Sequence, residues 1–152
     1  MEIELKQFLD NKIFASLRKK IRLASQKKQM KLGCHSYSIL GMPAEITKIL
    51  KSETFRSLLK QFNIRAKKPL LIAFDHGDFT LMNDKSLQSY RCLIDFSEKG
   101  KECGGYLSFV ADGKESIRRN PSPNSFFVFP KQKFFVKYIN SNAKKPIVYL
   151  FC

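Results

Sequence analysis

From residue 67 onward the sequence is a succession of short apolar runs separated by turn-forming residues. Each run has the length of a β-strand, roughly 4–8 residues, and the separators are rich in Gly, Asp, Asn, Pro and Lys. Several short strands at this spacing predict a sandwich or barrel and not a parallel α/β sheet. The runs read PLLIAF, DFTLM, SYRCLIDF, GGYLSFV, SFFVF, KFFVKYI and PIVYLF.

One of these runs shows the strand period clearly. Tyr90, Cys92, Ile94 and Phe96 alternate with Arg91, Leu93 and Asp95. That alternation predicts a half-buried strand. The basic segment 114–120, followed by Pro121 and Pro123, is predicted to be a flexible loop.

The first part of the chain is predicted to be mainly helical. Residues 3–29 form one expected helix, because apolar residues recur at close to helical spacing (Ile3, Leu5, Leu9, Ile13, Leu17 and Ile21). A short strand is expected at 34–40, before a break at Gly41-Met42-Pro43. Residues 44–62 predict one or two helices, with Ser52 as a candidate N-cap for the second.

The length of 152 residues indicates a single domain, 1–152. Residues 1–66 form the mainly helical part and 67–152 the β-strand core. The N-terminus lacks the features of a signal peptide and no run is long enough to span a membrane, so we expect a cytoplasmic protein. The cysteines form no C-x-x-C pair, which predicts reduced thiols that act as small apolar fillers.

The chain is strongly basic, with a net charge of +15, of which +11 falls on residues 1–68. Such an excess attracts nucleic acid, anionic lipid or an acidic protein, or it serves solubility alone. The sequence has no phosphate-binding G-x-x-x-x-G-K-[ST] loop and no G-x-S-x-G elbow, which argues against P-loop and α/β-hydrolase chemistry.

Three local patterns follow one another in the second half. The first is residues 76–84, HGDFTLMND; the second is 90–96, YRCLIDF, followed by GGYLSF at 104–109; the third is 123–129, PNSFFVF, followed by FFVKYI and KKPI. As a set they resemble the prolyl 4-hydroxylase-like branch of the Fe(II)/2-oxoglutarate-dependent dioxygenases. The resemblance covers residues 34–151 approximately. It implies an α+β fold in which N-terminal helices pack on a double-stranded β-helix, or jelly-roll, core.

The resemblance also implies a metal site. In that family a His, a carboxylate two residues later and a distal His hold Fe(II), and a basic residue downstream binds 2-oxoglutarate. On this chain the first two positions are Asn83 and Lys85, and the distal position falls near Phe135 or Val136. No His is found at any of them, whereas Lys144 or Lys145 suits the basic position. The spacing therefore indicates a fold whose metal triad has been replaced.

A second metal hypothesis uses His76 and Asp78, which form an H-x-D pair upstream of the expected place. His35 is the other His of the chain and would complete a three-ligand site, whereas His76 and Asp78 alone would form a weaker two-ligand site. The alternative is that His76 and Asp78 belong to a polar turn before a strand, where Asp is common.

A ligand site is expected inside the mouth of the barrel. Asn83, Lys85, Tyr90, Arg91 and Lys145 are the candidates to line it. Tyr90, Arg91 and Lys145 are the candidates for binding 2-oxoglutarate, although a one-residue shift in register would move their side chains to the other face.

Two main hypotheses follow. The first is a dioxygenase-superfamily enzyme that uses Fe(II) and 2-oxoglutarate on a protein or small-molecule substrate, in a catalytically divergent form. The second is an inactive relative without cofactor, which binds RNA, a ribonucleoprotein or an acidic protein through its basic N-terminal half. A protein–protein scaffold without any small ligand is a third option.

Overall fold

The strands of the second half lie where the apolar runs predicted them. The computed structural model describes residues 2–23, 26–31, 35–65, 68–75, 78–82, 90–98, 105–130, 133–138 and 146–152. The strands that match the runs are β4 (Leu70–Phe74), β5 (Phe79–Met82), β6 (Tyr90–Asp95), β7 (Gly105–Ala111), β9 (Ser125–Pro130), β10 (Lys133–Tyr138) and β11 (Ile147–Phe151). The others are β1 (Ile3–Lys6), β2 (Gln26–Lys31), β3 (His35–Leu40) and β8 (Lys114–Arg119).

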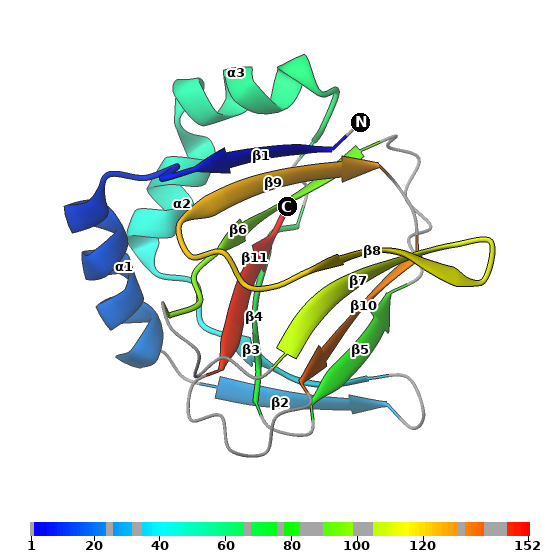
Figure 1. Ribbon diagram of the computed structural model, residues 1–152. Coiled ribbons are helices and arrows are strands. Elements are labelled where there is room, and N and C mark those ends of the chain that lie inside the picture. Colours follow the sequence, from blue (N-terminus) through cyan, green and yellow to red (C-terminus); the bar gives the residue numbers. More distant parts are fainter. Residues whose placement is uncertain are drawn as a thin grey trace.

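All of these strands belong to one antiparallel sheet. Its order is β1-β9-β6-β11-β4-β3-β5-β10-β7-β8, and β2 pairs with β3. The sheet folds back on itself, because Phe109 on β7 contacts Phe127 and Phe129 on β9, although β7 and β9 lie near opposite ends of this order. Figure 1 shows β5, β10, β7 and β8 as one group of strands, set against the group that contains β4, β11, β6 and β9. The predicted jelly-roll fold class is confirmed.

The prediction of one helix over residues 3–29 is wrong at both ends. The structure has β1 at the start, α1 (Asn11–Leu23) in the middle and β2 at the end. Leu5 continues the four-residue spacing of Leu9 and Ile13, but Ile3 and Leu5 are two residues apart, which is the period of a strand. β1 pairs with β9 so that Ile3 lies opposite Val128. Strand pairing in the folded protein therefore decides that the first residues form a strand and not the start of a helix.

The start of α1 is fixed by Asp10. Its Oδ1 accepts hydrogen bonds from the backbone N–H groups of Lys12 at 2.9 Å and Ile13 at 3.3 Å, which the helix itself cannot satisfy. Gln7 has φ 52°, so the chain turns between β1 and the helix. The apolar residues with helical spacing therefore lie in a helix only after this turn, from Asn11 onward.

The stretch 44–62 forms two helices that meet at Ser52, as predicted. They are α2 (Ala44–Lys51) and α3 (Glu53–Gln61). Ser52 is extended, with ψ 147°, and its Oγ accepts from the N–H of Phe55 at 3.3 Å and donates to the carbonyl of Ile49 at 2.7 Å. One side chain thus ends the first helix and caps the second.

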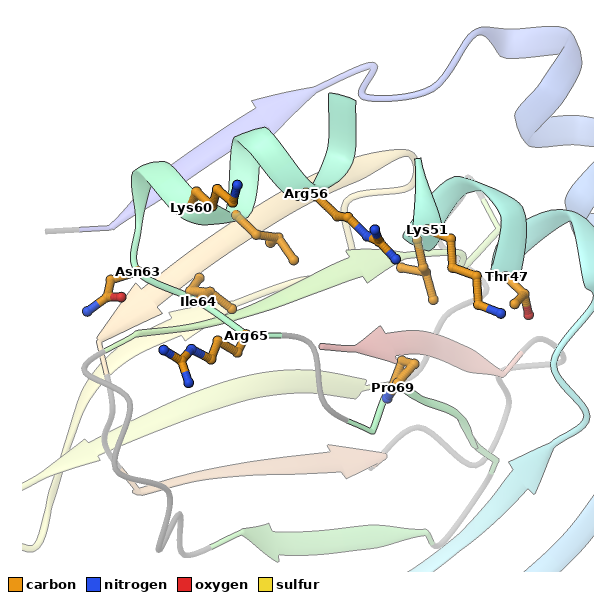
Figure 2. Close-up of a pocket in the computed structure, with 10 residues that line it drawn as sticks. Thr47, Lys51, Arg56, Lys60, Asn63, Ile64, Arg65 and Pro69 are labelled. Carbon is orange, nitrogen blue, oxygen red and sulfur yellow. The ribbon is translucent and has the colours of Figure 1, made fainter. Parts of the chain in front are cut away.

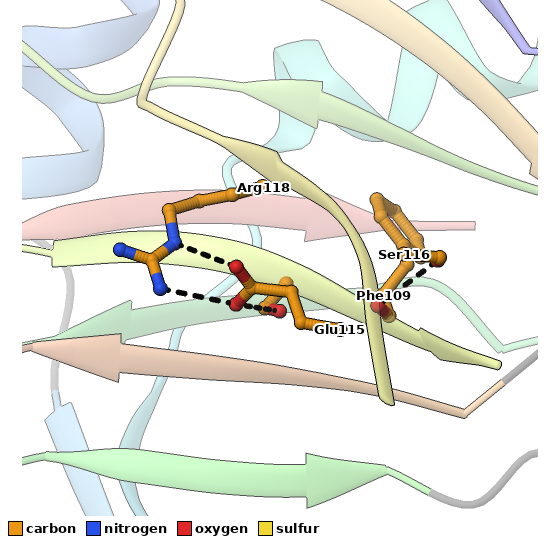
Figure 3. A network of polar contacts seen from close by, with 5 residues as sticks. Phe109, Glu115, Ser116 and Arg118 are labelled. Atoms are coloured by element: carbon orange, nitrogen blue, oxygen red, sulfur yellow. Dashed lines mark hydrogen bonds and ion pairs between the residues drawn. The ribbon is translucent and has the colours of Figure 1, made fainter. Parts of the chain in front are cut away.

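The prediction of a flexible loop at 114–120 is wrong. Residues 114–119 form β8, which pairs with β7 through a tight turn in which Asp112 has φ 51° and Gly113 has φ 75°. Asp-Gly with two positive φ angles is a favoured hairpin turn. Figure 3 shows how the charges on β8 are held: Arg118 Nε lies 3.0 Å from Glu115 Oε1, and the Ser116 hydroxyl donates to the carbonyl of Phe109. An edge strand tolerates this polar composition because one side faces water.

Both faces of the central strands are buried, which corrects the expectation of a half-buried strand at 90–96. The alternation is right, but helices cover one face and the opposite layer of strands covers the other. The helix-side core consists of Leu17, Ile21, Leu40, Ile46, Phe55, Leu59, Ile64, Leu71, Ala73, Cys92, Ile94, Phe96, Phe126, Val128, Val148 and Leu150. The jelly-roll interior consists of Ile72, Phe74, Leu93, Leu107, Phe109, Phe127, Phe129, Ile147, Tyr149 and Phe151.

The three helices lie on one side of the sheet (Figure 1). Arg18 of α1 forms an ion pair with Glu98 at 2.8 Å, and Lys20 of α1 pairs with Glu45 of α2. These contacts connect α1 to the end of β6 and to the next helix. Within the described ranges, no helix has the length and apolar character needed to cross a membrane.

Candidate functional site

Aromatic rings pack closely in the part of the jelly-roll interior that the structure describes. Phe109 lies 5.0 Å from Phe129 and 5.8 Å from Phe127 between ring centroids, and Phe127 stacks on Phe129 at 5.4 Å. Tyr149 and Phe151 on β11 add an edge-to-face pair at 5.8 Å. All ten residues of the jelly-roll interior are at most 3% exposed. Aromatic pairs in these geometries are favourable beyond the area that they bury, so this space behaves as a packed core.

Arg119 on β8 lies over one end of this interior. Its guanidinium carbon is 3.8 Å from the centroid of the Phe127 ring, and its Nη1 is 3.0 Å from Glu4 Oε2 on β1. Glu2 lies 3.9 Å from the same guanidinium. Because β1 and β8 are the two terminal strands of the sheet order, this ion pair connects the two edges of the sheet.

The charges at this end influence one another. Burial alone would raise the pKa of Glu4, but hydrogen bonds from Arg119 and Ser122 and the positive charge of Arg119 lower it on balance. The carboxylate of Glu4 is therefore held in its charged form beside the guanidinium. The side chain of Arg119 thus covers this end of the interior, and the carboxylate of Glu4 balances its positive charge.

The cavity that remains beside Arg119 is very small. Its volume is about 20 Å³, and Asp95, Leu107, Phe127 and Tyr149 are among the residues that line it. A space of this size holds about one water molecule, whereas small-molecule sites usually occupy roughly 300–1,000 Å³. The part of the interior that the structure describes therefore has no room for a dicarboxylate ligand.

Asp95 lines this cavity, and its carboxylate is hydrogen-bonded to the backbone. Its carboxylate accepts from the N–H of Ser97 at 2.7 Å and of Ser122 at 2.6 Å. Burial raises the pKa of Asp95 above its ordinary value, while those hydrogen bonds and the charge of Arg18 oppose the rise. The side chain thereby connects the end of β6 to the segment before β9.

The carboxylate of Asp78, a candidate metal ligand, is also hydrogen-bonded, in this case within a turn. Its Oδ2 accepts from the N–H of Asp75 at 3.0 Å, and its own N–H donates to the carbonyl of Asp75 at 2.9 Å. Asp78 is 3% exposed and directly precedes β5. These contacts are those of a polar turn before a strand; His76 lies outside the described residues.

The positions that match the family's metal triad lie toward the other end of β5. Asn83 and Lys85 follow Met82, the last residue of β5, and they lie outside the described residues. At about 3.3 Å per residue, Asp78 is roughly 13 Å from Met82 along the strand. The His76–Asp78 pair therefore does not substitute for the family positions by a small shift in register.

The distal position lies on the neighbouring strand. β10 pairs with β5, and Phe135 is opposite Leu81 while Val136 is opposite Thr80. His35 begins β3 and is opposite Thr80 on the other side of β5. The strand that ends just before the predicted first position thus pairs with the strand that carries the distal position, but the residue types at those positions supply no imidazole.

The structure separates Tyr90 from Arg91. Tyr90 is half-buried and packs against the helix-side core. Arg91 is opposite Phe129, a residue of the jelly-roll interior, and directly opposed residues share a face, so Arg91 lies on the interior face. The position of Tyr90 therefore argues against a role in the barrel mouth. The role of Arg91 in binding 2-oxoglutarate stays a prediction. Lys144 and Lys145 lie outside the described residues.

A second concave surface, which sequence reasoning missed, lies on the helical side. A groove of about 630 Å³ runs along α2, α3 and the segment that leads to β4. Figure 2 shows that its cationic residues come from both helices and from the segment after α3. The lining residues are Thr47, Leu50, Lys51, Arg56, Leu59, Lys60, Asn63, Ile64, Arg65 and Pro69. The available sequence signal was Arg56 and Lys60, four residues apart beside apolar positions of one helix.

Comparison with solved structures identifies the architecture. The *Pseudomonas putida* prolyl-4-hydroxylase superposes with a TM-score of 0.75 at 15% identity, over 99% of this chain and 90% of its own. The chain has the fold of these oxygenases. A *Burkholderia pseudomallei* oxidoreductase of the 2OG-Fe(II) oxygenase family gives 0.72 at 13% identity, over 99% and 84%. A *Trichoplax adhaerens* prolyl hydroxylase, solved with a hypoxia inducible factor peptide fragment, gives 0.72 at 14%, over 99% and 82%. No family model and no curated protein sequence matches the chain.

The residues present do not fit the iron and 2-oxoglutarate that the oxygenase fold implies. Lys85 would place a cation beside Fe(II), and Phe135 and Val136 have no donor atom. In the part of the chain that the structure describes, no group of three or more His, Cys, Asp or Glu side chains is arranged to hold a metal ion.

Proposed function

We propose that this chain uses the 2OG-Fe(II) oxygenase fold as a non-catalytic binding module for an acidic partner. The observation that carries the proposal is the packing of the described part of the jelly-roll interior, where aromatic rings and Arg119 leave a cavity of about 20 Å³ beside Arg119. Ligand sites in barrel folds lie in the mouth of the barrel. Side chains that pack closely there stabilise the fold but leave no room for a ligand.

The donor set supports the same conclusion. Two His residues are present in the whole sequence, and neither stands at the positions that match the family's triad. Asp78 already accepts a hydrogen bond within its own turn. A His-carboxylate-His iron site at the family positions would need three substitutions of residue type, one at each position.

The charge distribution supports an acidic partner. Net charge of +15 is concentrated in the first 68 residues, which include α2 and α3. Positive surface potential raises the rate at which an acidic partner associates, and this effect weakens with salt. Binding is therefore expected to be salt-sensitive.

A second candidate function is hydroxylation of a protein. It is favoured by the fold neighbours, because one of them is a prolyl hydroxylase solved with a peptide fragment bound. Under this alternative, His76 and Asp78 supply the metal ligands, Arg91 and Lys145 bind 2-oxoglutarate, and the interior rearranges when the ligands enter.

An anaerobic titration with Fe(II) and 2-oxoglutarate distinguishes the two candidates. An iron that binds both ligands gives a visible charge-transfer absorbance, and we expect none for this chain because the described part of the interior is packed and the triad positions carry no His. The *Burkholderia pseudomallei* oxygenase serves as the positive control. A saturable band that disappears in His76→Ala would refute the non-catalytic proposal and establish a metal site at the start of β5.

A further inference from the structure

The groove on α2 and α3 has an apolar floor and a cationic rim. Leu59 and Ile64 form the buried part of the floor, each 4% exposed, and Leu50 and Pro69 are half-buried beside them. The rim carries four exposed cations, Lys51, Arg56, Lys60 and Arg65. Among these lining residues there is no Asp or Glu, so the groove lining itself supplies no carboxylate for Lys51, Arg56 or Lys60.

The shape of the groove is fixed by the way α3 ends. Asn63 has φ 54°, and its N–H donates to the carbonyl of Lys60 at 3.0 Å. The N–H of Ile64 donates to the carbonyl of Leu59 at 3.0 Å. A left-handed residue with such return hydrogen bonds is a common helix C-cap, and here it turns Ile64 into the floor. The floor is therefore preformed, which reduces the entropic cost of binding.

We propose that this groove binds an acidic amphipathic helical segment of a partner protein. Apolar side chains of such a helix would cover the half-buried Leu50 and Pro69, which lie beside the buried Leu59 and Ile64, and its carboxylates would pair with Lys51, Arg56 and Lys60. Arg56 and Lys60 lie one turn apart on α3, about 6 Å, which matches two carboxylates spaced by four residues on a helix. The inference deepens the proposed function and rests on it only for the claim that binding is the main role of the chain.

The lining favours a peptide over nucleic acid. Proteins that bind single strands stack bases on aromatic side chains, at about 1–3 kcal/mol per base, and no aromatic residue lines this groove. A phosphate chain would pair with the cations but leave the half-buried side chains of Leu50 and Pro69 in contact with water. A peptide with one apolar and one acidic face satisfies both parts.

The test measures binding of a fluorescent designed peptide by anisotropy. The peptide has Leu or Ile at positions i, i+3, i+4 and i+7, and Glu on its other face. A scrambled peptide of the same composition and a single-stranded oligonucleotide of the same length are the comparison probes. We expect saturable binding of the amphipathic peptide and at least about fivefold weaker binding of the scrambled one, because scrambling removes the apolar face.

Variants of the rim locate the site. The double variant Arg56→Glu with Lys60→Glu should weaken peptide binding at least about tenfold. The matched control, Lys12→Glu with Lys114→Glu, makes the same change in net charge on exposed residues of α1 and β8, and should change it by less than about threefold. Arg56→Gln with Lys60→Gln serves as the second variant, and circular dichroism confirms that each is folded.

Several outcomes would overturn the inference. Equal weakening by both double variants would show attraction to overall charge and not to the groove. Equal binding of the scrambled peptide, or no saturable binding of the amphipathic one, would exclude helix recognition. Tighter binding of the oligonucleotide, lost in the rim variant, would assign the groove to nucleic acid. The iron titration is a separate measurement on the same protein, so failure of the non-catalytic proposal is seen independently.

Discussion

Asp95 shows how one buried carboxylate can be structural in a fold known for metal-binding carboxylates. It is 2% exposed and accepts from two backbone N–H groups, those of Ser97 and Ser122. Its carbonyl accepts from the N–H of Asn124 as well. A single residue therefore holds the end of β6 against the segment that leads into β9.

We expect Asp95→Asn to lower the free energy of unfolding by about 1–3 kcal/mol, because the amide group offers one acceptor oxygen and turns N–H atoms toward the second backbone donor. Urea denaturation at neutral pH measures this loss. Asp112→Asn, in the exposed β7–β8 turn, is the control and should stay within about 0.5 kcal/mol of wild type.

The pH dependence of this difference has a defined sign. The folded-state pKa of Asp95 is raised by burial, so the folded protein favours the neutral carboxyl relative to the unfolded chain. The stability of wild type relative to Asp95→Asn is then greatest below the unfolded pKa of about 3.9 and falls as pH rises through the folded pKa. A difference that grows from about pH 3.5 to pH 7 would contradict this assignment.

At the scale of elements, the junction of α2 and α3 depends on Ser52. The same hydroxyl accepts from Phe55 and donates to Ile49, so both helix ends share one polar group. This junction also places Lys51 at the end of one helix and Arg56 in the first turns of the next. The cap is therefore part of the framework of the groove.

Ser52→Ala should lower the free energy of unfolding by about 1 kcal/mol, because it leaves the N–H of Phe55 without its side-chain acceptor. Thermal and denaturant unfolding of the variant measure the effect. Ser57→Ala provides the comparison within α3, where alanine is the better helix former and a small gain is expected. Equal effects at both positions would show that the cap is not the source.

For the whole molecule, the two cores lie on either side of β4, β6, β9 and β11. The helix-side core and the jelly-roll interior take alternate residues of the same strands, so each strand is buried on both faces. The ion pair between Arg119 and Glu4 then joins the two edges of the folded sheet. An interior that served a ligand would be expected to tolerate the loss of one ring better than a packed core does.

We expect Phe109→Ala to lower the free energy of unfolding by about 3–5 kcal/mol, because it removes a fully buried ring that contacts Phe127 and Phe129. Leu70→Ala is the control, since Leu70 is 40% exposed at the end of β4, and it should cost less than about 1 kcal/mol. A loss below about 1 kcal/mol for Phe109→Ala would contradict the description of the interior as a core.

The sequence by itself determined the apolar strands, the junction at Ser52 and the strong positive charge. These follow from local properties: the two-residue period of a strand, the capping ability of a serine hydroxyl and the count of ionised side chains. The resemblance to the oxygenases came from three local sequence patterns and their order along the chain, and the superposition with solved structures agrees with it in fold.

Only the tertiary structure decided the rest. β1 and β8 are edge strands that exist through pairing with β9 and β7, so apolar periodicity did not distinguish the first from a helix or the second from a loop. The faces of Tyr90 and Arg91 depended on register. The groove on α2 and α3 arises from residues that are brought together by the Ser52 cap and the left-handed turn at Asn63, because neither the depth of a surface nor the neighbours of a cation can be read from spacing alone.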